Sequence, residues 1–286
     1  MPKSPESEDI FELIRPNRPT NWPEIPLIFS IPHSGRVYPP EFLAQSAVDV
    51  SELRRSEDAL VDQFFVSAPN FGATLLIMRL ARIYIDVNRS EDLLDPLLIE
   101  DIPPHTAIGA SPFLASGIGV LTRLSALGNP IYRARISHAE AKARIDRFYR
   151  PFHAQLAALI AEYQARFGHC IVIDCHSMPP VRAGVDIVLG DQFGRSCHAS
   201  LIDQCEKIFR GFGYRVKRND PYAGGYITQH YGQSGQNIQV LQIEIARTLY
   251  LDDKTLLPSR HFSHVTEQIS HSISELALFV QRKSRS

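Results

Sequence analysis

The sequence predicts an α/β fold with a mixed, largely parallel central sheet flanked by helices. Short apolar segments, each bounded by Gly, Pro or polar residues, are typical of buried strands. Longer segments with apolar residues three and four positions apart indicate amphipathic helices. The two kinds of segment alternate along the chain, which favours helices packed on a largely parallel sheet.

Six segments are predicted to be strands. The first, residues 26–31, is an apolar run that ends at Pro32 and Gly35, and these two residues favour a turn. The other predicted strands are residues 73–78, 82–87, 170–174, 185–189 and 240–245.

Three segments are predicted to be helices: residues 51–67, 137–167 and 263–279. In the second, apolar residues recur at spacings of three and four from Ile145 to Tyr163. Residues 92–119, rich in Pro and Gly, are predicted to form a long irregular excursion. Such a segment is either a binding loop or an insertion without a role.

The composition is that of a folded globular protein. The chain has 286 residues, of which 44% are hydrophobic and 21% charged, and its mean hydropathy is −0.12. We expect one domain over residues 1–286, with residues 1–20 forming a loosely ordered N-terminal segment.

The charge balance favours a small-molecule partner over a nucleic acid or a membrane. Lys and Arg number 30 and Asp and Glu number 31, so the chain as a whole has no basic field. Its apolar runs are far shorter than the roughly 20 residues that span a bilayer.

The N-terminus and the cysteines indicate the compartment. Residues 1–9 do not resemble a secretory signal, and the four cysteines include no C-x-x-C pair. We therefore expect a cytoplasmic protein with reduced thiols.

Chemically capable residues lie at the ends of three predicted strands, where ligands bind in α/β sheets. They are His33, then Asp86, Asn88 and Arg89, and then Asp174 and His176. Two histidines and one carboxylate would form a three-ligand zinc site with an open position for water. Glu57, Asp58 and Asp62 are candidates for the acidic ligand, and Asp174 is a candidate to orient His176.

Structural interpretations of the same residues remain open. A histidine after a strand is often a hydrogen-bonded turn residue, and His-Ser-Gly is an ordinary turn sequence. Acidic residues at a helix start are often solvated or interact with the helix dipole. The occurrence of these residues together favours the metal site.

Glu244 lies in the predicted strand 240–245, on the face opposite Leu241, Ile243 and Ile245. A carboxylate in an apolar strand is costly unless it is paired or functional. It could act as a general base on water. The alternative is a buried ion pair with a residue such as Arg247.

Asn88 and Arg89 are candidates to bind a substrate carboxylate, because a guanidinium donates two parallel hydrogen bonds to it. Arg79 and Arg82 could share this role, and a surface Arg that closes a turn is the alternative. The Gly-rich segment around Gly224 and Gly225 allows close approach of the backbone to a ligand, and it lacks a phosphate-binding P-loop pattern.

Cys175, beside His176, is an alternative to metal-activated water as the nucleophile. However, adjacent residues of a strand point to opposite faces, so Cys175 and His176 are not expected to pair.

Six motifs in order resemble the N-formylglutamate amidohydrolase family, and they extend from about residue 26 to residue 250. They are Pro32-His-Ser-Gly35, Asp58-x-x-x-Asp62, Ile85-Asp-x-Asn-Arg89, Asp174-x-His-Ser177, Asn219-Asp-Pro-Tyr-x-Gly-Gly225 and Gln242-Ile-Glu244. The number and order of the motifs make the resemblance specific.

The resemblance implies a fold similar to zinc-dependent carboxypeptidases and aspartoacylases. It implies zinc bound by His33, His176 and an acid near position 57, where Asp58 keeps the spacing to Asp62 and Glu57 is the alternative. The acid follows His33 by 25 positions, unlike the short His-x-x-Glu of carboxypeptidases.

The resemblance further implies that Glu244 is the catalytic glutamate and that Asn88 and Arg89 bind the substrate carboxylate. The expected reaction is hydrolysis of N-formyl-L-glutamate to formate and glutamate, a step of histidine degradation. The alternatives are a related N-acyl amino acid hydrolase or carboxypeptidase, and an inactive metal- or amino-acid-binding protein.

Overall fold

A computed structural model describes residues 10–16, 22–106, 108–109, 112–180, 184–233, 235 and 237–283. Of the N-terminal segment expected to be loosely ordered, residues 1–9 and 17–20 lie outside the described residues. The chain divides into two compact units. Unit 1 consists of residues 1–12, 32–57 and 78–156, and unit 2 of residues 13–31, 58–77 and 157–286. A single domain stays a prediction.

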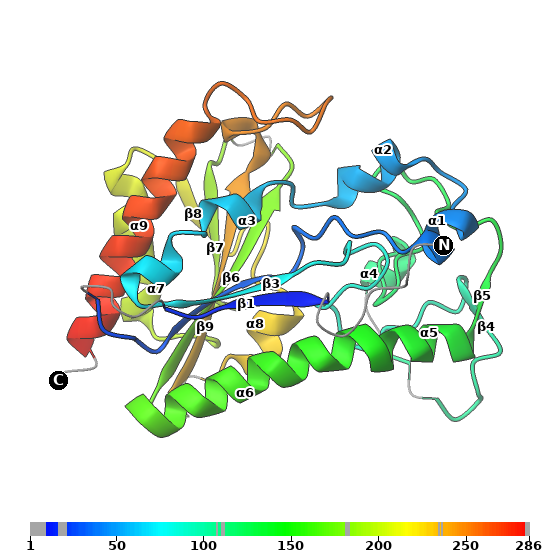
Figure 1. The fold of residues 1–286 in the computed structure, drawn as a ribbon, viewed down its shortest axis with the longest axis horizontal. Coiled ribbons are helices and arrows are strands. Elements are labelled where there is room, and N and C mark those ends of the chain that lie inside the picture. The colour runs from blue at the N-terminus through cyan, green and yellow to red at the C-terminus, as the bar shows by residue number, and fades with distance from the viewer. Residues whose placement is uncertain are drawn as a thin grey trace. The chain divides into compact units, whose positions relative to one another are not determined.

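A seven-stranded mixed sheet forms the centre of unit 2 (Figure 1). Strand β2 pairs in parallel with β3 and β6, β6 with β9, and β7 with β8, whereas β7 and β9 are antiparallel. In sheet order the strands are β1 (Phe11–Ile14), β3 (Thr74–Met78), β2 (Leu27–Ile31), β6 (Cys170–Met178), β9 (Ile238–Ala246), β7 (Ile187–Gly190) and β8 (Val216–Arg218). The predicted α/β class with a largely parallel sheet is confirmed.

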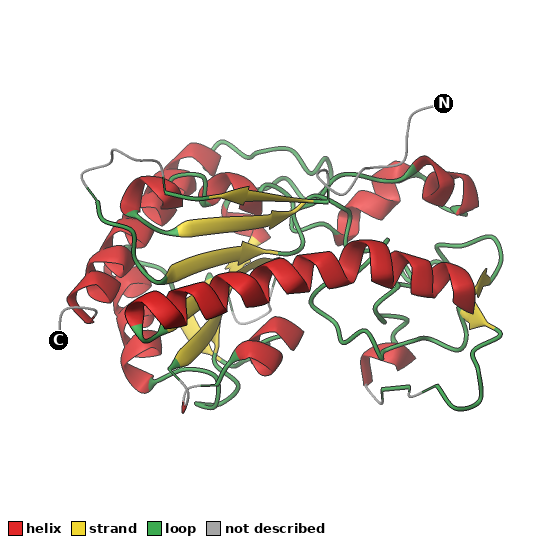
Figure 2. Ribbon diagram, turned by 60° about the horizontal axis from the view of Figure 1, so that its bottom comes forward, coloured by secondary structure: helices red, strands yellow, loops and turns green. Residues whose placement is uncertain are grey.

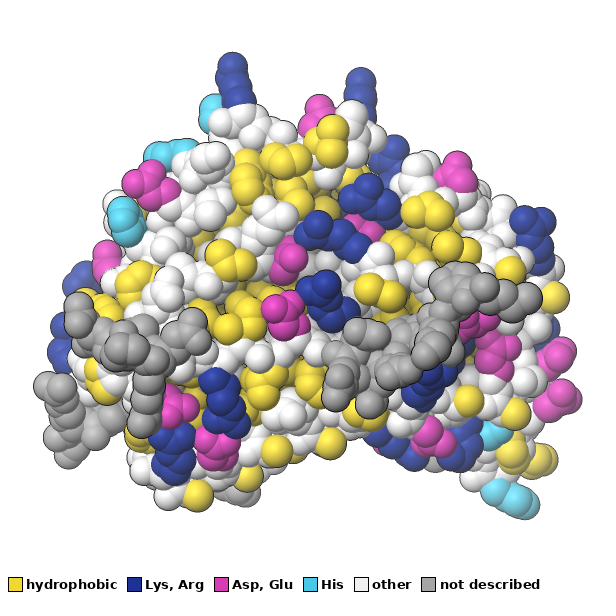
Figure 3. Space-filling model, viewed as in Figure 1, with side chains coloured by type: hydrophobic (Ala, Val, Ile, Leu, Met, Phe, Trp, Pro, Cys, Tyr) yellow, Lys and Arg dark blue, Asp and Glu magenta, His cyan; other side chains and the backbone are white. Residues whose placement is uncertain are grey.

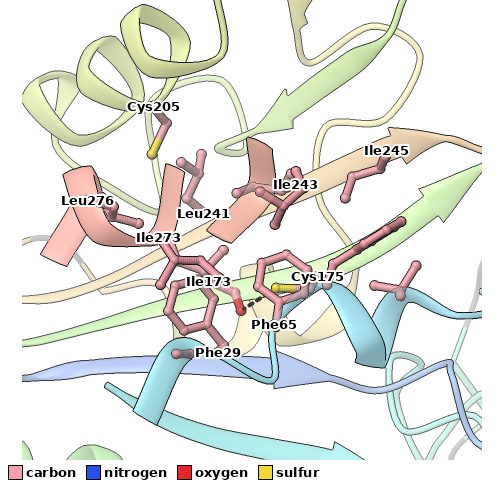
Figure 4. Close-up of a cluster of buried hydrophobic side chains, with 14 of the residues drawn as sticks. Phe29, Phe65, Ile173, Cys175, Cys205, Leu241, Ile243, Ile245, Ile273 and Leu276 are labelled. Atoms are coloured by element: carbon pink, nitrogen blue, oxygen red, sulfur yellow. Dashed lines mark hydrogen bonds between the residues drawn. The ribbon is translucent and has the colours of Figure 1, made fainter. Parts of the chain in front are cut away.

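The two faces of this sheet differ in chemistry because successive side chains of a strand point to opposite faces. Alternate residues of the central strands, such as Phe29, Ile173 and Ile243, belong to one large hydrophobic core. Figure 4 shows these side chains converging with Phe65 and Leu276. The residues between them in β6 and β9 therefore point to the opposite face of the sheet.

Helices cover the sheet in unit 2. Helices α3 (Val61–Phe64), α7 (Ala199–Gly211) and α9 (Phe262–Lys283) contribute apolar side chains to the large core. On the other face, Tyr163 of α6 (Arg150–Phe167) shares a 2.6 Å hydrogen bond with Thr74 of β3. Figure 2 views the molecule from the side of α6. Helix α8 (Tyr226–Tyr231) contacts β9.

Unit 1 has mostly loops and short elements. They are α1 (Pro40–Gln45), α2 (Val50–Leu53), β4 (Ile99–Glu100), α4 (Pro112–Ala115), β5 (Ile136–Ser137), α5 (His138–Arg144) and the first part of α6. Strands β4 and β5 pair in parallel. A π-helical turn, Ile145–Tyr149, joins α5 to α6, which confirms the helical segment predicted over residues 137–167. The last predicted helix, residues 263–279, corresponds to α9.

Two predicted elements are wrong. Residues 82–87 form turns and not a strand. Their apolar side chains are buried, for example those of Ile83 and Ile85. A short apolar run indicates burial, and here the buried segment does not pair with a strand. Residues 51–67 are not one helix, because Glu57 has an extended backbone and Leu60 has a positive φ of 67°. These two residues turn the chain between α2 and α3.

No helix among the described residues is long and apolar enough to cross a membrane.

On the face shown in Figure 3, acidic and basic side chains are interspersed. This mixture agrees with the formal net charge of −1.

Candidate active site

Strand β6 directs Asp174 and His176 to the face opposite the hydrophobic core of unit 2. The intervening Cys175 belongs to that core, and its thiol lies 3.5 Å from the carbonyl oxygen of Ile173 (Figure 4). Burial raises the pKa of the Cys175 thiol well above its usual value. The location of Cys175 agrees with the alternation expected from the sequence and argues against a thiolate nucleophile paired with His176.

His176 lies between two buried carboxylates. Its Nδ1 is 3.0 Å from Oδ2 of Asp58, and its Nε2 is 3.0 Å from Oδ2 of Asp174. Burial disfavours the charged ring, but Asp174 and Asp58 outweigh that effect and raise the pKa of His176 well above its usual value. The sequence-based expectation that Asp174 orients His176 agrees with this contact.

Asp58 is connected to the end of the sheet through Arg247. Nη2 of Arg247 lies 3.2 Å from Oδ1 of Asp58, and its Nε lies 3.0 Å from Oγ of Ser177. Asp58 is only 1% exposed. The guanidinium of Arg247 therefore compensates the charge of the buried Asp58 carboxylate, and its contact with Ser177 connects Asp58 to the end of β6.

Glu244 of β9 is adjacent to His176 of β6 in the strand register, and Gln242 is adjacent to Asp174. Glu244 and Gln242 are 7% and 4% exposed. Nε2 of Gln242 donates a 2.8 Å hydrogen bond to Oε1 of Glu244. Two neighbouring parallel strands thus place a histidine and two carboxylates on the same face of the sheet.

In unit 1, Asp86 organises a second group of buried polar residues. Its Oδ1 lies 2.8 Å from Nε2 of His33 and accepts a 2.8 Å hydrogen bond from the backbone N–H of Asn88. Its Oδ2 accepts a 2.8 Å bond from Arg82. Burial opposes the charge on Asp86, but the neighbouring His33 and Arg82 hold the pKa of this carboxyl well below its usual value.

The turn that carries His33 depends on glycine. A Cβ on Gly35 would lie 2.2 Å from the carbonyl oxygen of Leu80, a distance that no side chain tolerates. Gly35 therefore lets residues 32–35 pack closely against the backbone of residues 79–80.

Arg89 is held by several contacts within unit 1. Its Nη1 donates a 3.0 Å bond to the carbonyl oxygen of Asn88, and its guanidinium carbon lies 4.2 Å from the centre of the Phe113 ring. The hydroxyl of Tyr149 donates to the carbonyl oxygen of Arg89 at 2.8 Å. Packing on an aromatic ring restricts the orientation of the guanidinium.

His33, Asp58 and His176 form a group that could hold a metal ion. One ligand atom from each lies within 4.8 Å of those of the other two, and all three residues are buried. Glu57, the alternative acid, accepts a 2.6 Å hydrogen bond from the Tyr38 hydroxyl, and burial raises the pKa of its carboxyl. Of the three acidic candidates, Glu57, Asp58 and Asp62, Asp58 is the one in this group.

Comparison with known proteins identifies the family of this chain. The family model of N-formylglutamate amidohydrolases matches residues 25–251, a segment that contains His33, Asp58, His176 and Glu244. The chain belongs to the N-formylglutamate amidohydrolase family. It is accordingly a hydrolase that acts on an amide bond.

Individual members of this family are similar over most of their length. The chain is 28% identical to the N-formylglutamate deformylase of Pseudomonas aeruginosa, covering 88% of this chain and 91% of the relative. It is 26% identical to the N-formylglutamate deformylase of Pseudomonas putida, over 80% and 83% of the two chains. The crystal structure of N-formylglutamate amidohydrolase from Ralstonia eutropha JMP134 superimposes with a TM-score of 0.90 at 33% identity, covering 96% of this chain and 99% of that one.

Sequence reasoning missed several partners in this amidohydrolase. It assigned no contact to Asp86, which binds both His33 and Arg82. It considered Arg247 as a partner of Glu244 and missed the contact of Arg247 with Asp58. Gln242 was named as part of the motif Gln242-Ile-Glu244, without a role. The Gln-x-Glu spacing was the available signal, because residues two apart in a strand share a face.

Proposed function

We propose that this chain hydrolyses N-formyl-L-glutamate to formate and L-glutamate with the help of a zinc ion. His33, Asp58 and His176 are the proposed ligands, and Glu244 is the proposed general base. The observation that carries the proposal is the buried His-Asp-His group, with Glu244 adjacent to His176 in the sheet, in a chain of the N-formylglutamate amidohydrolase family.

The donor set fits zinc. Catalytic zinc sites use three protein ligands of the His and Asp or Glu type. Nε2 of His33 lies 2.8 Å from Oδ1 of Asp86, and Nε2 of His176 lies 3.0 Å from Oδ2 of Asp174. Ligating histidines characteristically donate their other N–H to a carboxylate in this way. We therefore assign Nδ1 of both rings as the ligand atoms.

The chemistry that zinc would supply at these residues is Lewis acidity, which polarises a carbonyl oxygen and makes a water molecule more acidic. Glu244 takes a proton from the attacking water through its carboxylate. The water oxygen bonds to the formyl carbon. When the carbon–nitrogen bond breaks, Glu244 returns the proton to the departing nitrogen, so formate and the amine of glutamate are the products.

Asn88 and Arg89 are proposed to bind the substrate carboxylate, because a guanidinium matches a carboxylate with two parallel hydrogen bonds. The stacking of Arg89 on Phe113 would fix the plane of that contact. Arg82, Gly224 and Gly225 complete the proposed substrate-binding set. Arg82 also donates to Asp86, so it has a structural task in addition.

The reaction belongs to histidine degradation if the substrate is N-formyl-L-glutamate. We propose the cytoplasm as its location. All four cysteines are unpaired and buried, which fits a reducing compartment.

Parallel assays of zinc-loaded protein test the substrate. Formate release from N-formyl-L-glutamate should exceed release from N-formyl-L-aspartate, and short peptides with a free carboxylate should not be cleaved. Faster turnover of another acyl amino acid or of a peptide would replace N-formylglutamate as the substrate. No turnover of any of them would point to a binding protein and contradict the proposal.

A further inference from the structure

Gln242 lies where β9 passes between β6 and β7. In the register it is adjacent to Asp174 on β6 and to Gly190 on β7. Gln242 is 4% exposed, so its amide must satisfy its hydrogen bonds within the protein. It shares a face with Glu244, two residues further along the strand.

The hydrogen bonds of Gln242 fix which end of its amide faces Glu244. The backbone N–H of Gly225 donates to Oε1 of Gln242 at 2.6 Å. Because a backbone N–H can only donate, the amide oxygen must face Gly225 and the NH₂ group must face Glu244. The NH₂ group then donates to Oε1 of Glu244 at 2.8 Å.

The position of Gly225 is itself fixed by the segment that follows β7. The N–H of Gln192 donates to the carbonyl oxygen of Ala223 at 2.8 Å, and its side-chain amide donates to the carbonyl oxygen of Gly224 at 2.6 Å. A Cβ on Gly190 would lie 2.7 Å from the backbone of Ala223 and Gly224. The Gly-rich segment is therefore packed directly against the end of β7.

We infer that Gln242 is a positioning residue for the hydrolytic reaction: it is held by Gly225 and fixes Oε1 of Glu244, so that Oε2 receives the proton from water. The inference rests on the proposed role of Glu244 as the base. It assigns the Gly-rich segment a task besides substrate binding, because Gly225 orients the residue that orients the base.

Gln242→Met tests positioning against mere anchoring of the Gly-rich segment. Met is similar in size to Gln and removes both hydrogen bonds. Loss of positioning alone lowers kcat, whereas loss of anchoring of a substrate-binding segment also raises KM. The matched control is Gln239→Met on the same strand, since Gln239 is also buried and its Oε1 accepts from the backbone N–H of His198 at 3.1 Å.

The measurement is kcat and KM of the zinc-loaded variants, together with bound zinc and the thermal midpoint. A misaligned catalytic group costs up to about 100-fold. Gln242→Met should lower kcat by roughly 10- to 100-fold, with KM changed less than about threefold and zinc retained. Gln239→Met should keep kcat within about twofold of the wild type.

Wild-type kcat in Gln242→Met would overturn the inference, because this variant has no donor to Glu244. Glu244→Gln, assayed in parallel, tests the proposed function separately. If Glu244→Gln is inactive while Gln242→Met is fully active, only the role of Gln242 fails. If Glu244→Gln is fully active, the assignment of the base fails.

Discussion

At the scale of single residues, the site combines side chains that are costly to bury alone. His176 has a carboxylate at each ring nitrogen, and Asp58 has Arg247 against its second oxygen. Buried charges of this kind are retained only when they are paired or bind a metal. The burial of these groups therefore depends on their partners.

Replacing Glu244 by Gln tests the proposed base. The amide has nearly the same shape but cannot take a proton, so kcat should fall by roughly 100- to 10,000-fold. Bound zinc, measured by metal analysis, should stay at the wild-type level because Glu244 is not a proposed ligand. Activity within a few-fold of the wild type would exclude Glu244 as the base.

Replacing Asp174 by Asn tests the orientation of His176. The neutral amide is a weaker acceptor for the ring N–H, so zinc affinity should fall by about 10-fold, at the lower end for residues that orient a ligand. Competition with a chromogenic chelator gives the affinity. Asp252→Asn, a change in a surface turn, is the control and should bind zinc normally. Equal affinity of both variants would remove Asp174 from this role.

At the scale of helices and strands, the sequence identified the segments that end at the site. Residues 26–31 and 170–174 are apolar runs followed by polar residues, and the structure has β2 and β6 there. Such patterns are local. The Asp58–His176 contact spans 118 positions and the Arg247–Asp58 contact spans 189, so no local pattern could indicate them.

The two wrong elements have the same physical explanation. Residues 82–87 look like a strand because they are buried, yet they form turns whose Asp86 carboxylate accepts from the backbone of Asn88. Residues 51–67 look helical from their apolar spacing, yet Leu60 adopts a left-handed backbone conformation. Tertiary contacts outweighed local propensity in both segments.

Arg144 of α5 is expected to stabilise the aromatic cluster of unit 1. Its guanidinium lies 4.3 Å from the centre of the Tyr84 ring and donates to the Tyr132 hydroxyl at 2.8 Å. Arg144→Lys loses the planar fork, so the free energy of unfolding should fall by about 2–3 kcal/mol. Urea denaturation measures this. The exposed Lys142→Met should change stability by less than about 0.5 kcal/mol, and a similar effect of both would contradict the expected role of Arg144.

Glu24 connects the segment before β2 to α6 and makes stability depend on pH. It accepts a 2.6 Å bond from Arg166, which lowers the pKa of its carboxyl below the usual value. A lowered folded-state pKa stabilises the protein above the unfolded pKa, about 4.3, and the contribution is lost as pH falls through the folded-state pKa.

Glu24→Gln should therefore cost about 1 kcal/mol at pH 7, a small value because Arg166 is partly exposed. The difference from the wild type should shrink at pH 4 and below. Denaturation at both pH values measures it. The exposed Glu275→Gln on α9 is the control and should show no difference, and a Glu24→Gln effect that grows towards acid pH would contradict the pairing with Arg166.

At the scale of the whole molecule, the family assignment and the buried group support one chemistry. The family match spans residues 25–251, so every proposed ligand and the proposed base lie inside it. The near-neutral charge, with 30 basic and 31 acidic residues, agrees with a small-molecule substrate.

The central claim is metal-dependent hydrolysis of N-formyl-L-glutamate at His33, Asp58 and His176. The most direct measurement is formate release by protein that has been stripped with a chelator and then resupplied with zinc. The account predicts loss of activity on stripping and its return with about one zinc per chain, a return that His176→Ala should abolish. Full activity in metal-free protein would contradict it.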